Sequence, residues 1–246
     1  MLILLPPSEG KATPAEGAPV DLDSLVYAEQ LGPRREALLD ALERLAGAPR
    51  KAAARRLGVS PGQADEVEVG VGLRAAPAAP AAEVYAGVLY DRLRLAELPA
   101  AARRRVLIAS ALWGVVRPED RIPYYRFSSK ARLGRIGPPA AFWRSPLAAA
   151  LPDEPGELVV DMRSAAYAAA WKPKRATLLA VRAFSEEDGR RKVVSHMAKA
   201  VRGDVARALL LARQPPRDPT AAAAVAVEAG FEVELSGPSL DVIVGD

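Results

Sequence analysis

The chain has 246 residues, of which 50% are hydrophobic and 26% are charged. This composition excludes a disordered or collagen-like chain and is sufficient for a sizeable core. There is no cysteine and one histidine, so disulfide scaffolds, cysteine–zinc sites and thiol nucleophiles are excluded. Lys and Arg outnumber Asp and Glu by 34 to 30, and the net charge of +4 is compatible with an anionic partner without requiring one.

The first residues do not have the pattern of a targeting segment. The apolar run MLILL stops after five residues at Pro6 and Pro7, whereas a signal peptide needs a basic start and an apolar stretch of roughly 7–15 residues. No other stretch offers the roughly 18 apolar residues of a membrane span. We therefore expect a cytoplasmic protein without a membrane partner.

Short runs of nearly continuous apolar residues predict buried strands, because strands covered on both faces lose their polar alternation. These runs lie at residues 2–5, 106–110, 158–161, 176–181 and 192–195, with a last pair near 231–235 and 242–244. Helical periodicity occupies the intervals, at residues 33–57, 83–95, 142–151, 164–170, 195–213 and 218–229. The alternation predicts an α/β fold with a mixed β-sheet flanked by helices.

A helical subregion is expected at about residues 33–100. Within it, residues 58–63 form a predicted turn in which Ser60 caps a second helix, giving a helical hairpin preceded by a basic stripe. The Ala- and Pro-rich stretch at 75–82 is too short to separate two independent domains. Residues 1–246 are therefore predicted to form one domain.

The basic residues are segregated along the chain. Residues 101–135 carry nine Lys or Arg against two acidic residues, and residues 171–213 carry eleven against four. Each segment has a net charge of +7, so the remainder of the chain carries −10. Such segregation is what an anion-binding face requires.

The loop after the first strand carries polar residues suited to an anion. Ser8, Gly10 and Lys11 bring backbone N–H groups and an ammonium to the end of a strand. The glycine spacing excludes a Walker loop. An ordinary polar turn is the alternative.

Aromatic and arginine residues are concentrated at 110–126. Trp113, Tyr124 and Tyr125 offer stacking surfaces beside Arg117 and Arg126. Aromatic rings interleaved with guanidinium groups suit a nucleobase and its phosphate. In the alternative interpretation, Trp113 and one tyrosine pack beneath the loop.

Two later segments also follow predicted strands. Asp161 lies at the carboxyl end of its strand, where α/β enzymes place catalytic groups, and Ser164 is a suitable helix N-cap. The helix from residue 195 places His196, Lys199, Gly203 and Arg207 at successive intervals of three or four residues, so its cations could form one ridge. A solvated helix face is the alternative explanation for this ridge.

Six segments share the pattern of one known family. The first strand and its Pro-Ser loop are followed by VYAG at 84–87, SALWGVVRPEDRIPYYR at 110–126, FW at 142–143, VVDMRSAAYAAAWKP at 159–173 and VVSHMAKAVRGDVAR at 193–207. Together they resemble the YaaA family of bacterial peroxide-stress proteins. The resemblance implies a cofactor-free cytosolic α/β protein with a helix–hairpin–helix-like element. It also implies DNA binding in a positively charged cleft and a role in limiting oxidative DNA damage.

The resemblance extends to individual residues of a DNA- or anion-binding site. The predicted set is Ser8, Lys11, Trp113, Arg117, Tyr125, Arg126, Tyr167, Lys172, Lys199 and Arg202. Because strand ends of an α/β sheet meet at one edge, we expect Lys11, Arg117, Arg126, Lys199 and Arg202 to surround a single concavity.

Three functions are compatible with these residues. The first is DNA binding in the peroxide-stress response, with phosphates paired to cations and aromatics stacked on a base. The second is a metal-independent enzyme acting on a nucleotide or nucleobase-like substrate, with Asp161 as the first candidate general base and His196 as the second. The third is partner binding with incidental basic patches. We expect no metal and no cofactor. If the cations lie in an enclosed cavity and not in an open groove, the enzyme interpretation is favoured over DNA binding.

Overall fold

A computed structural model describes residues 1–45, 48–57, 72–187, 190–193 and 197–244. The main sheet has the strand order β4-β3-β1-β6-β7-β10-β9, with β8 paired to β7. The strands are β1 (Leu2–Leu5), β3 (Val106–Ser110), β4 (Gly114–Val116), β6 (Leu158–Asp161), β7 (Thr177–Glu187), β8 (Arg190–Val193), β9 (Glu232–Ser236) and β10 (Ser239–Val244). The central strands β3, β1, β6, β7 and β10 are parallel, whereas β4, β8 and β9 are antiparallel to their neighbours.

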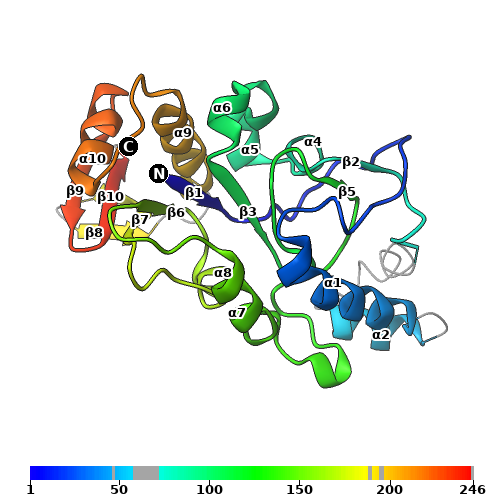
Figure 1. Ribbon diagram of the computed structural model, residues 1–246. Helices are drawn as coiled ribbons and strands as arrows, with labels where there is room; N and C mark the ends of the chain where they lie inside the picture. The colour runs from blue at the N-terminus through cyan, green and yellow to red at the C-terminus, as the bar shows by residue number, and fades with distance from the viewer. Residues whose placement is uncertain (46–47, 58–71, 188–189, 194–196, 245–246) are drawn as a thin grey trace.

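Helices cover both faces of this sheet (Figure 1). They are α1 (Ala28–Glu43), α2 (Arg50–Leu57), α4 (Ala81–Val84), α5 (Val88–Leu93), α6 (Ala100–Arg103), α7 (Pro139–Ala150), α8 (Ala165–Ala168), α9 (Met197–Leu211) and α10 (Pro219–Glu228), with single 3-10 turns at Leu95–Glu97 and Gly134–Ile136. In Figure 1, α9 and α10 lie above the sheet and α7 and α8 below it. A small second sheet joins β2 (Ala78–Pro80) to β5 (Arg121–Pro123). The expected α/β fold with a mixed sheet flanked by helices is confirmed.

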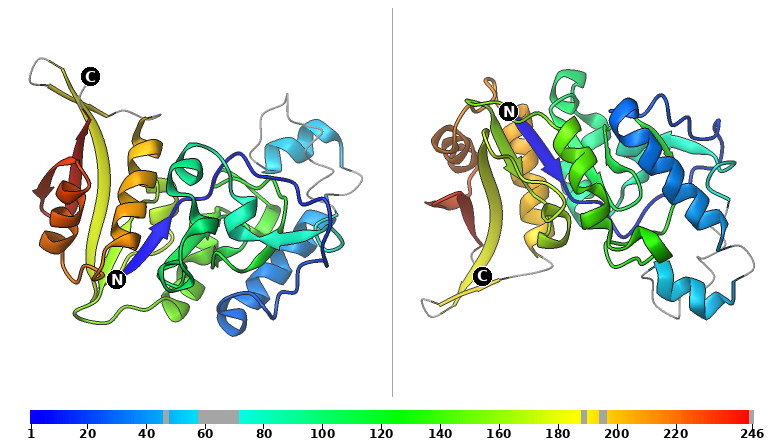
Figure 2. Two further views of the ribbon diagram at one scale, coloured as in Figure 1. Left: turned by 90° about the horizontal axis from the view of Figure 1, so that it is seen from above. Right: turned by 60° about the horizontal axis from the view of Figure 1, so that its bottom comes forward.

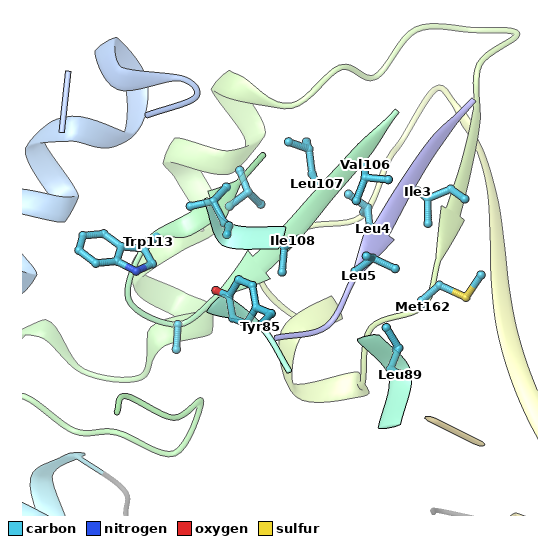
Figure 3. Packing of buried hydrophobic residues seen from close by; sticks show 14 of the residues in the cluster. Ile3, Leu4, Leu5, Tyr85, Leu89, Val106, Leu107, Ile108, Trp113 and Met162 are labelled. Carbon is cyan, nitrogen blue, oxygen red and sulfur yellow. The ribbon is translucent and has the colours of Figure 1, made fainter. Parts of the chain in front are cut away.

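The core is centred on β1, whose neighbours are β3 and β6 (Figure 3). Ile3 and Leu5 are fully buried, as are Val106 and Ile108 on β3. A parallel strand with both faces covered must be apolar at every position, which explains why these runs lack alternation. Each buried aliphatic side chain contributes about 1.5–3 kcal/mol.

Several expected elements have different boundaries. The helix predicted over 33–57 is two helices, and the first begins earlier, at Ala28. Pro49 immediately precedes the second helix, and a proline without an N–H group commonly starts a helix. The strand predicted at 192–195 overlaps β8, which begins earlier, at Arg190, and is described as far as Val193. Residues 194–195 and the turn predicted at 58–63 lie outside the described residues. Three-residue strands at 78–80, 114–116 and 121–123 were not expected, because such short segments have no detectable periodicity.

Arg35 joins α1 to the segment after β3. Its side chain is 0% exposed, and its guanidinium donates to the carbonyl oxygens of Val26 (2.8 Å), Trp113 (3.1 Å) and Val115 (3.0 Å). Burial lowers the pKa of Arg35 to about 10, although the charge of Asp120 acts in the opposite direction. A buried cation that satisfies three carbonyl groups fixes the path of the backbone around them.

Asp120 stabilises the same region through the backbone. Its Oδ2 accepts hydrogen bonds from the N–H groups of Val26 (3.1 Å) and Arg117 (2.9 Å). Desolvation raises the pKa of Asp120 despite these two hydrogen bonds. Asp120 therefore fastens two loops to each other.

Gly203 permits α9 to approach α5 closely. A Cβ atom at this position would lie 2.4 Å from the carbonyl oxygen of Leu89 and 2.9 Å from the Cβ of Arg92. Only a residue without a side chain fits such a crossing. The neighbouring residue Asp204 also joins α9 to α5, because its carboxylate accepts hydrogen bonds from the guanidinium of Arg92 at 2.8–3.0 Å. Figure 2 shows α9 beside the strand β1 from two further directions.

Within the described part of the chain, no helix is long and apolar enough to cross a lipid bilayer.

Substituting Gly203→Ala should destabilise the fold by about 1–3 kcal/mol, because the added methyl group would overlap a backbone atom. Gly32→Ala is the matched control, since Gly32 lies in α1 and a methyl group added there would have nothing within 4 Å. The control should be neutral or more stable by up to about 1 kcal/mol. Urea unfolding measures both. Equal stability of the two variants would contradict the close crossing.

Candidate functional site

A concave site of about 640 Å³ lies at the carboxyl ends of the central strands. Its walls come from the loop after β1, the start of α5, the segment after β5, the loop after β6 and the first turns of α9. We call this site the basic pocket; its lining residues are Pro6, Pro7, Ser8, Glu9, Gly10, Lys11, Ala86, Gly87, Val88, Leu89, Tyr90, Tyr125, Arg126, Phe127, Ser128, Ser129, Lys130, Ser164, Tyr167, Lys199 and Arg202.

Sheet topology accounts for this position. The chain passes from β1 to β3 on one side and reaches β6, on the other side of β1, only afterwards. The strand order thus reverses at β1, and open α/β sheets bind ligands at such a switch point. The loops after β1 and β6 both contribute to the basic pocket, as this rule requires.

Five cations from three parts of the chain line the basic pocket. Lys130 and Lys199 are exposed and form its rim, whereas Lys11, Arg126 and Arg202 are half-buried within it. We call the first two the rim cations and the other three the inner cations. Glu9 is the one acidic residue among the described lining residues. The basic pocket therefore favours an anionic ligand.

Lys11 is held against an aromatic surface. Its Nζ donates to the carbonyl oxygen of Ser8 at 2.7 Å and lies 4.5 Å from the ring centroid of Tyr125. The Ser8 hydroxyl accepts from the N–H of Ala86 at 3.2 Å, and the backbones of Lys11 and Tyr85 form a β-bridge. The cation–π contact and these bonds fix the loop and the ammonium together.

Buried tyrosines lie behind Lys11. The Tyr85 and Tyr125 hydroxyls are 2.7 Å apart, the Ser110 hydroxyl is 2.8 Å from Tyr125, and Tyr90 donates to the carbonyl oxygen of Pro6 at 2.7 Å. Burial raises the pKa of all three phenols, so they stay protonated at physiological pH. They form a rigid, neutral floor.

The guanidinium groups of the inner cations are also anchored. Arg126 donates from Nη1 to the carbonyl oxygen of Glu9 at 2.6 Å and from Nε to the Tyr124 hydroxyl at 2.8 Å. Arg202 donates from Nε to the carbonyl oxygen of Val181 at 3.2 Å. Arg202 is half-buried, and this burial lowers its pKa. Electrostatic interactions with a ligand are stronger in such a setting than in water.

Asp161 does not line the basic pocket. Its two carboxylate oxygens accept from Nε and Nη2 of Arg163 at 2.8 Å, and Arg163 also donates to the carbonyl oxygen of Trp171 at 2.8 Å. Both side chains are at most 6% exposed. This geometry argues against the expected role of general base, because the carboxylate is committed to an ion pair. Asp161 and Arg163 instead fix the loop that supplies Ser164 and Tyr167. His196, the other candidate, lies outside the described residues.

Three residues of the predicted set are not lining residues. Trp113 is 0% exposed and its ring is nearly perpendicular to that of Tyr125, with centroids 6.0 Å apart. The expectation that Trp113 stacks on a ligand is therefore wrong, and it packs beneath the loop instead. Arg117 and Lys172 are exposed in irregular segments and are not among the residues that line the basic pocket. Arg117 thus fails to join the predicted cluster of five cations.

The other seven predicted residues do line the basic pocket: Ser8, Lys11, Tyr125, Arg126, Tyr167, Lys199 and Arg202. Sequence reasoning missed Phe127, Ser128, Ser129 and Lys130, which continue directly from Arg126. The signal available was the position of Lys130 inside the basic segment. No group of three His, Cys, Asp or Glu residues placed to hold a metal ion occurs among the described residues.

Comparisons with known proteins agree over almost the whole chain. A family model described as peroxide stress protein YaaA matches residues 1–233. A UPF0246 protein of Streptomyces coelicolor is 45% identical over 259 aligned residues, covering 99% of this chain and 98% of that protein. A UPF0246 protein of Corynebacterium efficiens is 39% identical over 96% of both chains, and an uncharacterized protein of Campylobacter jejuni is 29% identical over 82% of both. The resemblance inferred from the sequence segments is confirmed.

Substituting Asp161→Asn should cost about 3–5 kcal/mol of stability, because the guanidinium of Arg163 would stay buried without its counter-charge. Glu154→Gln is the control, since Glu154 pairs with Arg175 on the surface, where both side chains are more than half exposed. An exposed pair contributes at most about 1 kcal/mol. Chemical denaturation compares the two variants, and equal losses would contradict the structural role of the buried pair.

Proposed function

The chain belongs to the family of the peroxide stress protein YaaA, and on that premise we propose that it binds DNA at the basic pocket as part of the response to peroxide stress. One observation carries this proposal: five cations from separate parts of the chain surround one concavity. Cations attract the phosphate backbone irrespective of sequence, and this attraction supplies most of non-specific DNA affinity.

The two basic segments of the sequence supply four of these cations. Arg126 and Lys130 belong to residues 101–135, and Lys199 and Arg202 belong to residues 171–213. Two cations from each of these basic segments therefore line the basic pocket. Guanidinium groups suit phosphate particularly well, because their planar fork binds two oxygens at once.

The cavity itself favours a second candidate function. A volume of about 640 Å³ lies within the range of roughly 300–1,000 Å³ typical of small-molecule sites. The alternative is therefore an enzyme that acts on a nucleotide or nucleobase-like substrate without a metal. Glu9 would be its proton carrier, since it is the acidic side chain among the described lining residues.

DNA binding should depend strongly on salt. If about three phosphates are neutralised, affinity should fall about 40-fold between about 50 and 200 mM monovalent salt. Lys199→Ala should lower the slope of log affinity against log salt by about 0.9. Lys174→Ala, an exposed lysine outside the basic pocket, is the control and should leave the slope unchanged. Fluorescence anisotropy with labelled duplex and single-stranded DNA provides the measurement. An affinity that does not change with salt concentration, or no binding at low salt, would count against the proposal.

The enzyme alternative has its own test. If the protein is such an enzyme, it should convert nucleotides to product at the same rate with and without a chelator. Glu9→Gln should abolish this turnover. Glu119→Gln, an exposed carboxylate paired with Arg103 away from the basic pocket, is the matched control. Unchanged turnover in Glu9→Gln would remove Glu9 as proton carrier, and no turnover with any nucleotide would leave binding as the function.

A further inference from the structure

Resting on the proposed function, we infer that the basic pocket accommodates a single nucleotide that has left the base stack of DNA. In this arrangement the rim cations hold the flanking backbone phosphates. The inner cations pair with the phosphate of the nucleotide inside. The substrate class is therefore DNA with an unpaired or readily extruded nucleotide.

The size and shape of the site support this inference. A concave site of about 640 Å³ has room for a drug-sized ligand. A duplex presents to a protein only the base edges in its grooves, which are about 6–12 Å wide, because the bases themselves are stacked inside. Proteins that bind a base in a pocket must take that base out of the stack. A continuous duplex could therefore contact the rim and leave the interior unused.

The cations differ in burial and in anchoring. Lys130 and Lys199 are exposed, as is appropriate for backbone phosphates that stay in solvent. Lys11 and Arg202 are half-buried, and each is fixed by a hydrogen bond to a carbonyl oxygen. Exposed cations reach any phosphate at the surface, whereas these inner groups reach a phosphate that enters the basic pocket.

The remaining lining has two kinds of surface. The apolar part includes Pro6, Pro7, Leu89 and Phe127, and four serine hydroxyl groups come from Ser8, Ser128, Ser129 and Ser164. A nucleotide requires both kinds of contact, since its base has an apolar face and polar edges.

Tyr167 is the aromatic side chain best placed to stack on a base. Tyr90, Tyr125 and Phe127 are buried, whereas Tyr167 is partly exposed and lines the basic pocket. Burial raises the pKa of Tyr167 to about 12, so its ring stays neutral at physiological pH. Stacking on an aromatic ring is tolerant of base identity. We therefore expect recognition of an extruded nucleotide with little sequence preference.

The test compares a matched duplex with the same duplex carrying a one-nucleotide bulge, at fixed salt. The wild-type protein should bind the bulged duplex about tenfold or more tightly. Tyr167→Ala and Arg202→Ala should reduce this ratio toward one, because each removes a group that contacts the extruded nucleotide. Tyr167→Phe keeps the ring and should keep the ratio. Lys130→Ala should weaken both duplexes by the same factor. Thymidine monophosphate should compete away only the extra affinity for the bulge.

The outcomes separate this inference from the proposed function. Equal, salt-dependent affinity for both duplexes in the wild type would overturn the extruded nucleotide and leave DNA binding intact. No binding of either duplex would overturn both. A lost preference in Lys130→Ala but not in Arg202→Ala or Tyr167→Ala would overturn the assignment of inner and rim groups.

Discussion

The basic pocket depends on the position of β1 in the sheet. This strand is hydrogen-bonded to β3 on one side and β6 on the other, and both neighbours are parallel to it. All three strands therefore end at one edge, where their loops must find space next to each other. Because the strands are apolar along their length, the polar residues of those loops are the first groups that a ligand can meet.

The loops at this edge are held by buried polar interactions. The ion pair of Asp161 and Arg163 fixes the loop that leads to Ser164 in the basic pocket. The hydroxyls of Tyr85 and Tyr125 are hydrogen-bonded to each other behind Lys11. The guanidinium of Arg35 fixes the backbone on both sides of Gly114. Burying such groups costs free energy unless every partner is present. Their contribution is geometric, since they hold the inner cations and the floor of the basic pocket in one arrangement before any ligand arrives.

Helix packing completes the site. The contact between Gly203 and Leu89 brings α9 against α5, and α9 carries Lys199 and Arg202. A bulkier residue would move both cations away from Lys11. Lys11 and Arg202 are about 190 positions apart in the sequence. The close crossing of α9 and α5 brings them to the same site.

Sequence reasoning succeeded where a residue pattern is local. The strands at 2–5, 106–110 and 158–161 have the predicted boundaries, because continuous apolar runs define them. It failed where the direction of a side chain depends on tertiary contacts. Trp113 and Arg117 flank the three-residue strand β4, yet one is buried and the other exposed. The periodicity of the sequence does not predict which way such side chains point. It also does not predict that Asp161 forms an ion pair with Arg163.

Lysine reactivity tests the central claim, that the basic pocket is where the anionic ligand binds, most directly. Acetylation of accessible amines would be quantified by mass spectrometry with and without a short bulged duplex. We predict that Lys11, Lys130 and Lys199 lose reactivity when DNA is bound. Lys51, Lys172 and Lys174, which are exposed outside the basic pocket, should react as before. Protection of Lys51, Lys172 or Lys174 with unchanged reactivity of the three pocket lysines would contradict this account.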